Sequence, residues 1–587
     1  MRKTKIICTI GPSSENENTL RQMIMHGMDV ARINFSHGTH AEHKQKVDLV
    51  KKIRNELGKH TALLLDTKGP EIRTGTLKAG KVQLEKNNLF TMCAYDVEGD
   101  ENRVSITYHD LYKDIRIGNK IFIDDGLIEL YVEKYDSKEI VCSVVNGGIL
   151  SDRKSVNVCD VALSIPFMSD NDREDIAFGA REDFDFIAAS FTQNAENIKQ
   201  IRRELEFNNC YDTRIIAKIE NATGVENIAE ILNESDGIMV ARGDLGVEIP
   251  LEDVPIIQKD LILKCYRAGK HVITATHMLE SMTHNPRPTR AEITDVANAI
   301  YDGTSATMLS GETAAGLYPI EAVKTMARIA ERTESEIDYK KRFSAIPIES
   351  ASNVTNAISH ATCTSAHDLK ASAIITVTTS GQTARLISRY RPETMIIGCS
   401  PNIKTCRHLN ISWGVTPVLI DEMTNTDDLL KHAVDKAYKQ KLVDYGDLVV
   451  ITAGIPLGIS GTTNMLKVEI VGDVLISGTA VGNKSVCSNL CVCANEEEAL
   501  KNCKTGDILV IPNTSKEIIE ILKHCKGIIC ERDGIDSYAA IVGQALDIPV
   551  IVGATGATKI LKSGTTVTID VVRGVVYSGD TSIILRK

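Results

Sequence analysis

A lysine and two carboxylates in the middle of the chain have types and spacing suited to phosphate and metal chemistry. Lys218 and Glu220 stand two positions apart in AKIEN, and Asp244 follows a later apolar run in ARGDLG. Because residues i and i+2 of a strand point to the same side, Lys218 and Glu220 should project together. Glu220 and Asp244 suit Mg²⁺ or Mn²⁺, which take carboxylates plus water and substrate oxygens, and Lys218 suits a phosphoryl oxygen. The alternative is a salt-bridge layer that merely closes the fold.

Two earlier segments contain arginines beside mostly neutral oxygen donors. They are RINFSHG, with Arg32, Asn34 and Ser36, and LLDTKGPEIRTG, with Asp66, Thr67 and Arg73. Arginine forms paired hydrogen bonds with phosphate, so both arginines are candidate phosphate ligands. The other four residues offer oxygens that carry one negative charge among them, which favours a monovalent cation such as K⁺. A hydrogen-bond network that only supports the loop is the alternative for this oxygen set.

Eight short apolar runs place these residues at the ends of strands. Each run stops at a polar or charged cluster, and most neighbouring runs are separated by enough chain for one helix. The runs are TKIICTIG, DVARINFS, TALLLDTK, DFIAASF, RIIAKIE, GIMVARGD, HVITATHM and SATMLSGE, all within residues 4–312. Eight strand–helix units in a row predict a (β/α)₈ TIM barrel, whose reactive groups converge at the C-terminal ends of the strands. Thr276, Ser310 and Glu312, at the ends of the last two runs, should therefore share one mouth with the residues above.

The rest of the chain predicts three further domains. Between the third and fourth runs, alternating segments such as KVQLE, LFTMCAY and EIVCSVV predict an inserted small β-barrel lid that closes over substrate. Helices alternating with AIITVTTS, TMIIGCS and LVVITAG predict an α/β domain, and DILVIP, GIIC and PVIVG belong to a last β/α unit. The expected boundaries are 1–69 and 157–337 for the barrel, 70–156 for the lid, 338–474 for the α/β domain and 475–587 for the last unit.

The composition is that of an acidic chain with many thiols. Its 587 residues carry a formal charge of −11, which argues against nonspecific binding to nucleic acid or anionic membranes. No apolar run reaches the ~18 residues that span a bilayer, and MRKTKIICTIGPSS lacks a signal-peptide pattern. We expect a cytoplasmic protein whose 15 cysteines are reduced thiols rather than disulfides. Cys491 and Cys493 form a CxC pair without a matching second pair, so metal binding is not expected there.

Taken together, these motifs resemble the pyruvate kinase family. CTIGPSS, ARINFSHG, DTKGPEIRTG, DFIAASF, AKIEN, ARGDLGVEIP, NPRPTRAE and MLSGETAAG occur in that order, and the likeness covers residues 1–474. The resemblance implies transfer of a phosphoryl group from phosphoenolpyruvate to ADP, giving pyruvate and ATP. It also implies a homotetramer that uses Mg²⁺ and K⁺.

The resemblance further implies a role for each residue at the mouth. Lys218 stabilises charge on the phosphoryl group in flight, and Arg73 and Lys154, from the lid hinge, hold nucleotide. The implied binding sets are Arg32, Lys218, Gly243, Asp244 and Thr276 for phosphoenolpyruvate, Glu220 and Asp244 for Mg²⁺, and Asn34, Ser36, Asp66 and Thr67 for K⁺. A relay through Thr276, Ser310 and Glu312 would bring a proton to the enolate carbon, with helix capping as the alternative for Thr276.

Three positions depart from the pattern of that family. His277 stands where the family usually has Gln, and Ser305 stands where it has Asp. NVCD at 157–160 replaces N-L-P-G at the lid hinge, so the motion of the lid is expected to differ. None of these changes removes a catalytic group, and we expect an active enzyme.

A hydroxyl-rich turn in the α/β domain predicts a phosphate site. TVTTSGQTAR contains Thr378, Thr379, Ser380, Gly381, Gln382 and Thr383 ahead of a helical segment. Hydroxyls and backbone N–H groups at a helix N-terminus bind phosphate, although an ordinary helix cap uses the same residues. The resemblance implies a loop for a phosphorylated allosteric effector, a sugar phosphate or a nucleoside monophosphate, with the loop at 451–464 covering it.

Residues 475–587 resemble the phosphohistidine swivelling domain of phosphoenolpyruvate-using enzymes. GIICERDGIDSYAAIVGQALDIPVIVG and GVVYSGD carry the likeness, but the T-S-H-A-A turn of that family reads DSYAA here, with Tyr538 in place of histidine. Tyrosine has no imidazole nitrogen to accept a phosphoryl group, so this domain is expected to serve stability, assembly or regulation.

Tyr538 also counts against the leading alternative, a phosphohistidine-dependent dikinase. A metal-dependent barrel lyase would need neither the K⁺ set nor the lid, and a non-catalytic scaffold would have lost Glu220 or Asp244.

Overall fold

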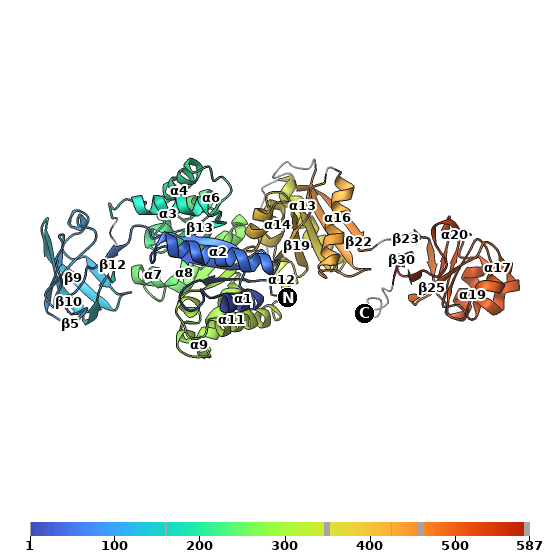
Figure 1. The fold of residues 1–587 in the computed structure, drawn as a ribbon, viewed down its shortest axis with the longest axis horizontal. Helices are drawn as coiled ribbons and strands as arrows, with labels where there is room; N and C mark the ends of the chain where they lie inside the picture. Colours follow the sequence, from blue (N-terminus) through green and yellow to red (C-terminus); the bar gives the residue numbers. More distant parts are fainter. Residues whose placement is uncertain are drawn as a thin grey trace. The chain divides into compact units, whose positions relative to one another are not determined.

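The structure is a computed structural model that describes residues 2–158, 161, 163–344, 353–423, 425–455, 463–472 and 474–579 (Figure 1). The chain divides into two compact units. The first holds residues 1–363, 376–421 and 453–464, and the second holds 364–375, 422–452 and 465–587. Among the described residues, no helix is both long enough and apolar enough to cross a bilayer.

Eight parallel strands form a closed barrel, as the eight apolar runs predict. In chain order they are β1 (Lys5–Thr9), β2 (Val30–Asn34), β3 (Ala62–Asp66), β13 (Phe186–Ala189), β14 (Arg214–Ile219), β15 (Gly237–Ala241), β16 (His271–Ala275) and β17 (Ala306–Leu309). They close in the order β1-β17-β16-β15-β14-β13-β3-β2, and β1 pairs with β17 from Lys5↔Ala306 to Cys8↔Leu309. The barrel fold predicted from the sequence is confirmed.

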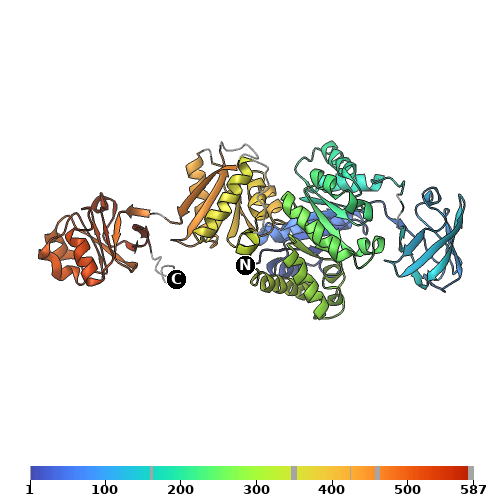
Figure 2. The same cartoon turned by 180° about the vertical axis from the view of Figure 1, so that it is seen from behind.

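Helices follow the barrel strands and surround them (Figures 1 and 2). They are α1 (Glu17–Met25), α2 (His40–Glu56), α3 (Asp170–Arg181), α4 (Ala195–Phe207), α5 (Ala222–Glu226), α6 (Ile228–Glu234), α7 (Arg242–Glu248), α8 (Val254–Ala268), α9 (Arg290–Asp302), α10 (Gly311–Ala314), α11 (Pro319–Glu334) and α12 (Tyr339–Ser344). Capping boxes fix the starts of several of these helices. At α2, for example, Thr39 and Glu42 each accept a backbone N–H of the other, which satisfies two donors that the first turn leaves free.

Both faces of the barrel strands are buried, which explains why the runs are apolar throughout. Side chains alternate along a strand. One set, including Ile7 and Leu64, packs in the barrel interior, and the alternate set, including Ile6, Leu63 and Leu65, packs in the larger core that includes the helices. Polar residues therefore gather where the strands end, and this is where the site lies.

The insert after β3 is built from short, mostly antiparallel strands, as predicted. They are β4 (Ile72–Arg73), β5 (Lys81–Leu84), β6 (Leu89–Cys93), β7 (Arg103–Ser105), β8 (Lys120–Ile123), β9 (Ile128–Tyr135), β10 (Glu139–Asn146), β11 (Gly148–Ser151) and β12 (Ser155–Val158). Seven form one sheet in the order β4-β12-β8-β9-β10-β6-β7, and β11 pairs with β5. A bridge between Thr74 and Ile106, next to the two edge strands, brings the sheet toward closure. Burial alternates along β9, where Ile128, Leu130 and Val132 face the core.

The segments after the barrel form two further sheets. The strands β18 (Ala373–Val377), β19 (Met395–Ser400), β20 (Val415–Leu419), β21 (Leu448–Gly454) and β22 (Thr463–Ile470) form a sheet in the order β20-β19-β18-β21-β22. The helices of this region are α13 (Val354–Asp368), α14 (Gln382–Arg389), α15 (Ile403–Leu409) and α16 (Thr426–Lys439). The four domain boundaries given above stay predictions.

The last sheet has eight strands in the order β23-β30-β29-β25-β26-β27-β28-β24. Their bounds are β23 (Val474–Ser477), β24 (Thr479–Val481), β25 (Val486–Val492), β26 (Ile508–Ile511), β27 (Gly527–Cys530), β28 (Val550–Val552), β29 (Thr566–Asp570) and β30 (Val575–Ser578). Helices α17 (Glu496–Asn502), α18 (Ile519–Leu522), α19 (Tyr538–Leu546) and α20 (Ala557–Ile560) accompany them. Two hydrophobic clusters use alternate residues of the central strands, with Leu509 in one and Ile508 in the other.

A buried ion pair joins α15 to the start of β13 within the first unit. Arg407 Nε lies 2.6 Å from Asp185 Oδ1, and Asp185 Oδ2 accepts the N–H of Leu63 at 2.8 Å. Burial raises the pKa of the Asp185 carboxyl, and Arg407 opposes that rise. The carboxylate is fully buried, so it depends on this cation.

Replacing Arg407 should therefore destabilise the first unit. We expect Arg407→Met to cost about 3 kcal/mol of unfolding free energy, because it leaves a buried carboxylate without its main partner. The matched control on the same helix is Lys404→Met, whose partner Asp183 is half exposed and whose ion pair should contribute less than about 1 kcal/mol. Urea unfolding followed by tryptophan fluorescence, which reports Trp413, measures both variants. Equal losses would contradict the assignment.

Candidate active site

The C-terminal ends of the barrel strands open into a cavity of about 410 Å³ that the insert also lines. The lining is highly charged. Its basic side chains are Arg32, Lys68, Arg73, Arg153, Lys154 and Lys218, and its acidic ones are Glu71, Asp124, Asp125, Glu220 and Asp244. Asn34, Ser36 and Ser190 contribute neutral oxygens. The cavity therefore offers cations for phosphate groups and a separate set of carboxylates for a metal ion.

Lys218 is the central charge of this cavity. It extends from β14, and its Nζ lies 2.9 Å from Glu220 Oε1 and 3.2 Å from Asp66 Oδ1. It also donates a hydrogen bond to Ser190 Oγ at 2.7 Å. Burial disfavours the ammonium, but Asp66 and Glu220 outweigh that effect and raise the pKa of Lys218. The side chain is thus held as a fixed positive charge.

Glu220 and Asp244 stand together at the ends of the neighbouring strands β14 and β15. Glu220 Oε2 accepts the N–H of Phe191 at 2.6 Å. Glu220 Oε1 is buried and, among the described residues, receives no well-directed hydrogen bond, although Lys218 Nζ is close. Burial raises the pKa of Glu220 to about 7, with Lys218 opposing and Asp244 adding to the rise. Two adjacent acids, one of which has an oxygen without a well-directed hydrogen bond, fit a divalent cation, so these residues suit Mg²⁺ or Mn²⁺.

The oxygen set expected for K⁺ lies where β2 and β3 end. Asn34 and Asp66 are register partners on these strands, and Arg32 Nε donates to Asp66 Oδ2 at 2.6 Å. Burial disfavours ionised Asp66, yet Arg32 and Lys218 together lower its pKa. The single charge of the set is thus already balanced by the protein. The remaining donors are the amide of Asn34, the hydroxyl of Ser36 and the carbonyl of Thr67, which suit a monovalent cation better than a divalent one.

The insert supplies charged groups to the cavity from its hinge strands. Arg73 Nε lies 2.9 Å from Glu71 Oε2, and Lys154 Nζ lies 2.9 Å from Asp124 Oδ1. These side chains are partly exposed to the cavity, so their ion pairs are easily exchanged for phosphate. Of the unusual hinge sequence, Asn157 and Val158 belong to β12, while residues 159 and 160 lie outside the described residues.

Thr276 and Gly243 are paired with each other. The N–H of Gly243 donates to Thr276 Oγ1 at 2.8 Å, and that hydroxyl donates to the carbonyl of Ala275 at 2.6 Å. Thr276 has φ 65°, a strained conformation that clusters at functional sites, and Arg242 donates to its carbonyl at 2.7 Å. His277 has φ 54° and is exposed, so the change from Gln leaves this backbone arrangement in place.

Ser310 and Glu312 lie at the end of β17, but Glu312 is fully buried. Its carboxylate accepts the N–H of Leu279 at 3.0 Å and the N–H of Ser310 at 2.7 Å. Burial raises the pKa of Glu312, and these donors oppose the rise. Neither residue lines the cavity, so the proton relay through them stays a prediction. The hydroxyl of Ser305, the other departure, accepts a hydrogen bond from Arg391 at 3.2 Å.

Sequence reasoning missed Ser190, which links several parts of the site. Its hydroxyl lies 2.7 Å from the Thr67 carbonyl, 3.1 Å from Asp66 Oδ1 and 2.7 Å from Lys218 Nζ. Ser190 follows β13 in DFIAASF, so its place directly after a strand was the available signal. Five charged residues of the lining were also missed: Lys68, Glu71, Asp124, Asp125 and Arg153.

The predicted effector turn follows β18 and starts α14. Thr378 Oγ1 accepts the N–H of Gly381 at 3.0 Å, and Gly381 has φ +80°. Thr379 is exposed, Ser380 is partly exposed, and Gln382 begins the helix. The buried Thr383 hydroxyl lies 2.7 Å from Thr463 Oγ1. The turn thus has the expected form, while residues 456–462 of the covering loop lie outside the described residues.

Comparison with known families agrees with this geometry. The model described as "Pyruvate kinase, barrel domain" matches residues 1–323, and "Pyruvate kinase, alpha/beta domain" matches residues 356–469. A third model, "PEP-utilising enzyme, mobile domain", matches residues 503–574. The last match confirms the resemblance at the C-terminus, where Tyr538 begins α19.

Several relatives match over their whole length. The pyruvate kinase of Sporosarcina psychrophila is 47% identical over 586 residues and covers 100% of both chains. That of Geobacillus stearothermophilus is 47% identical over 585 residues, which is 99% of this chain and 100% of the relative. The crystal structure of a pyruvate kinase from Cryptosporidium parvum superposes with a TM-score of 0.76 and 40% identity, covering 80% of this chain and 96% of that one. The chain belongs to the pyruvate kinase family and is a phosphotransferase.

Proposed function

We propose that this chain transfers the phosphoryl group of phosphoenolpyruvate to ADP and releases pyruvate and ATP. The observation that carries the proposal is the Lys218 ammonium, buried between Glu220 and Asp66 in a cavity that Arg32 and Arg73 also line. Phosphoryl transfer asks the protein mainly to position two substrates and to neutralise charge. Fixed cations around one phosphate-sized space meet that requirement.

Each charged or polar residue of the cavity has a proposed role that follows from its position. Lys218 holds an oxygen of the moving phosphoryl group, Arg32 and Arg73 bind phosphate oxygens, and Lys154 reaches the nucleotide from the insert. Glu220 and Asp244 would hold Mg²⁺, and Asn34, Ser36, Asp66 and Thr67 would hold K⁺. When bound, these cations neutralise negative charge on the phosphates and the enolate.

The second half of the reaction moves a proton. Cleavage of the phosphoenolpyruvate C–O–P linkage leaves an enolate, whose carbon takes up a proton to give pyruvate. The Gly243 N–H and the Thr276 hydroxyl, paired at 2.8 Å, can open toward the substrate carboxylate and enolate. We assign Thr276 as the group that donates the proton to the enolate carbon. Ser310 and Glu312 would supply that proton to Thr276.

A coupled assay tests the proposed reaction. Pyruvate should appear only when phosphoenolpyruvate and ADP are both present, and its rate should fall sharply when Mg²⁺ or K⁺ is left out. Turnover that needs inorganic phosphate and AMP would instead indicate dikinase chemistry. Tyr538 argues against that outcome, because it lacks the imidazole that such chemistry requires.

We also propose that a phosphorylated metabolite activates the enzyme at the turn formed by residues 378–383. Support comes from the left-handed Gly381 and the start of α14, whose first N–H groups have no partner within the helix. The homotetramer and the cytoplasmic location implied by the resemblance stay predictions; sedimentation analysis and cell fractionation measure them.

Lys218→Met should abolish turnover while leaving phosphoenolpyruvate binding nearly intact. The ammonium acts chiefly on the transition state, so kcat should fall by a factor on the order of 10³ or more. Lys199→Met, a change of the same size at a surface ion pair, is the matched control and should leave kcat unchanged. Near-normal kcat for the Lys218 variant would overturn the assignment.

Ser190→Ala should slow turnover by removing the hydroxyl that positions Lys218 and the Thr67 carbonyl. A lost hydrogen bond to a charged group costs about 1.5–3 kcal/mol, so kcat should fall roughly ten- to a hundredfold. The K⁺ concentration for half-maximal activity should also rise, which a purely structural defect would not cause. Thr192→Val, which loses a hydroxyl bonded only to the Ala189 carbonyl nearby, is the control. An unchanged K⁺ dependence would contradict the role.

The double variant Ser380→Ala/Thr383→Ala should lose activation while basal kcat is kept. The two hydroxyls belong to the phosphate turn, and neither lies among the reacting groups. A panel of sugar phosphates and nucleoside monophosphates is assayed at low phosphoenolpyruvate. Ser388→Ala, whose hydroxyl donates to the Trp413 carbonyl farther along α14, serves as the control. Persistent activation in the double variant would place the effector elsewhere.

A further inference from the structure

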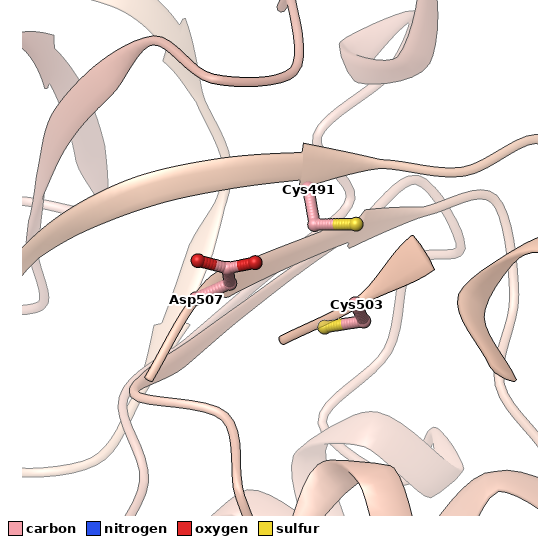
Figure 3. A group of neighbouring side chains, drawn as sticks. All are labelled: Cys491, Cys503 and Asp507. Atoms are coloured by element: carbon pink, nitrogen blue, oxygen red, sulfur yellow. The ribbon is translucent and has the colours of Figure 1, made fainter. Parts of the chain in front are cut away.

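Four cysteines and one aspartate come together in the second unit, to which none of the catalytic residues assigned above belongs. Cys491 is the second-last residue of β25 and Cys493 lies just beyond the strand, and Cys503 caps the C-terminus of α17. Asp507 precedes β26, and Cys525 precedes β27. In Figure 3 the side chains of Cys491, Cys503 and Asp507 surround one small space.

The distances in this cluster match those of a metal site. One ligand atom each from Cys491, Cys503 and Asp507 lies within 4.8 Å of the other two. Two further thiols flank this group, with Cys493 Sγ 3.6 Å from Cys491 Sγ and Cys525 Sγ 3.7 Å from Cys503 Sγ. Zn–S bonds of ~2.3 Å in a tetrahedron place two sulfurs about 3.8 Å apart, so the observed spacings are those of tetrahedral edges.

We propose that Cys491, Cys503 and Asp507 bind a thiophilic divalent cation of the Zn²⁺ class. A flanking thiol, Cys525 beside Cys503 or Cys493 beside Cys491, takes the fourth position after its side chain rotates, because neither belongs to the set of ligand atoms within 4.8 Å of one another. Binding displaces the protons of the ligating thiols into solvent, since the thiolate is the metal ligand. This site is separate from phosphoryl transfer, because every catalytic residue named above precedes residue 313.

The ligands are held by ordered backbone. Cys491 lies opposite Leu509 in the parallel ladder between β25 and β26. Asp507 Oδ2 accepts the N–H of Lys504 at 3.0 Å, which orients the carboxylate. Because these contacts already hold Cys491 and Asp507 in place, metal binding would not require a loop to become ordered first.

A disulfide would explain why fewer of these side chains lie close together than a bound metal would. Joining Cys503 to Cys525 would use two sulfurs and leave Cys491 and the Asp507 carboxylate without a reason to converge. All fourteen cysteines that the structure describes are free thiols. Cys503 and Cys525 stand 22 positions apart in the sequence and meet only in the fold, with their sulfurs 3.7 Å apart.

The test uses the full-length chain without a histidine tag, stripped of metal and kept reduced with a phosphine. Co²⁺ is titrated first, because thiolate ligands give an intense sulfur-to-cobalt absorption that the oxygen ligands of the barrel site do not. We expect that absorption to saturate at one Co²⁺ per chain and to be displaced by Zn²⁺. Zn²⁺ should also raise the thermal unfolding temperature, since it binds the folded state.

Variants decide which residues are responsible. Cys491→Ser/Cys503→Ser should lose the cobalt absorption, and Asp507→Asn, which keeps all four thiols, should weaken Zn²⁺ binding about tenfold or more. Cys487→Ser, on the same strand about 13 Å away, is the matched control and should bind as the unchanged chain does. Circular dichroism and the thermal unfolding profile confirm that each variant keeps the last domain folded, because pyruvate formation depends on residues of the first unit.

Two results would overturn the proposal. One is a wild-type chain without the thiolate absorption, or with one that the Cys491→Ser/Cys503→Ser variant retains. The other is recovery of a Cys503–Cys525 or Cys491–Cys493 disulfide from chain purified without reductant, with no metal bound after reduction. That second result would make the cluster a redox pair.

Discussion

The buried positive charge of Lys218 is the constraint on which the rest of the site depends. An ammonium inside a barrel is stable only beside negative charge, and Asp66 and Glu220 supply it from β3 and the end of β14. Each acid also has a second role, because Asp66 belongs to the oxygen set with Asn34 and Glu220 belongs to the carboxylate pair with Asp244. The positions that we propose for the two cations and for the phosphoryl group are therefore coupled through one lysine.

This coupling explains why the closed barrel matters. Asp66, Lys218 and Asp244 are far apart in the chain, and only strand closure brings them within reach of one another. Burial on both faces of the strands fixes their register, because a slip by one residue would move every polar group away from the mouth. The insert then completes the lining with Arg73 and Lys154, which lie at its junction with the barrel. The barrel strands hold the charged centre, and the inserted domain adds charged groups at the edge of the cavity, where we propose that nucleotide binds.

The sequence predicted the elements and the polar residues at their ends, because apolar runs that stop at charged groups are a local signal. All eight barrel strands occur where those runs predict them. Contacts between segments had no such signal. Ser190 gains its importance only from the closeness of Thr67 and Lys218, and Glu312 proves to be buried among backbone donors rather than open to the cavity. The pairing of Cys503 with Cys525 was likewise invisible in the spacing.

The last domain keeps a capped helix start at Tyr538, the position where the domain that it resembles carries histidine. Ser537 still caps α19 by accepting the N–H of Ala540, so the turn that presents histidine in the related domains is intact around Tyr538. Tyr538 packs against the same hydrophobic cluster as Cys503, and that cluster contains Cys491, Cys493 and Cys525. A metal bound by those thiols, as proposed above, would tie β25 to the segments that precede β26 and β27.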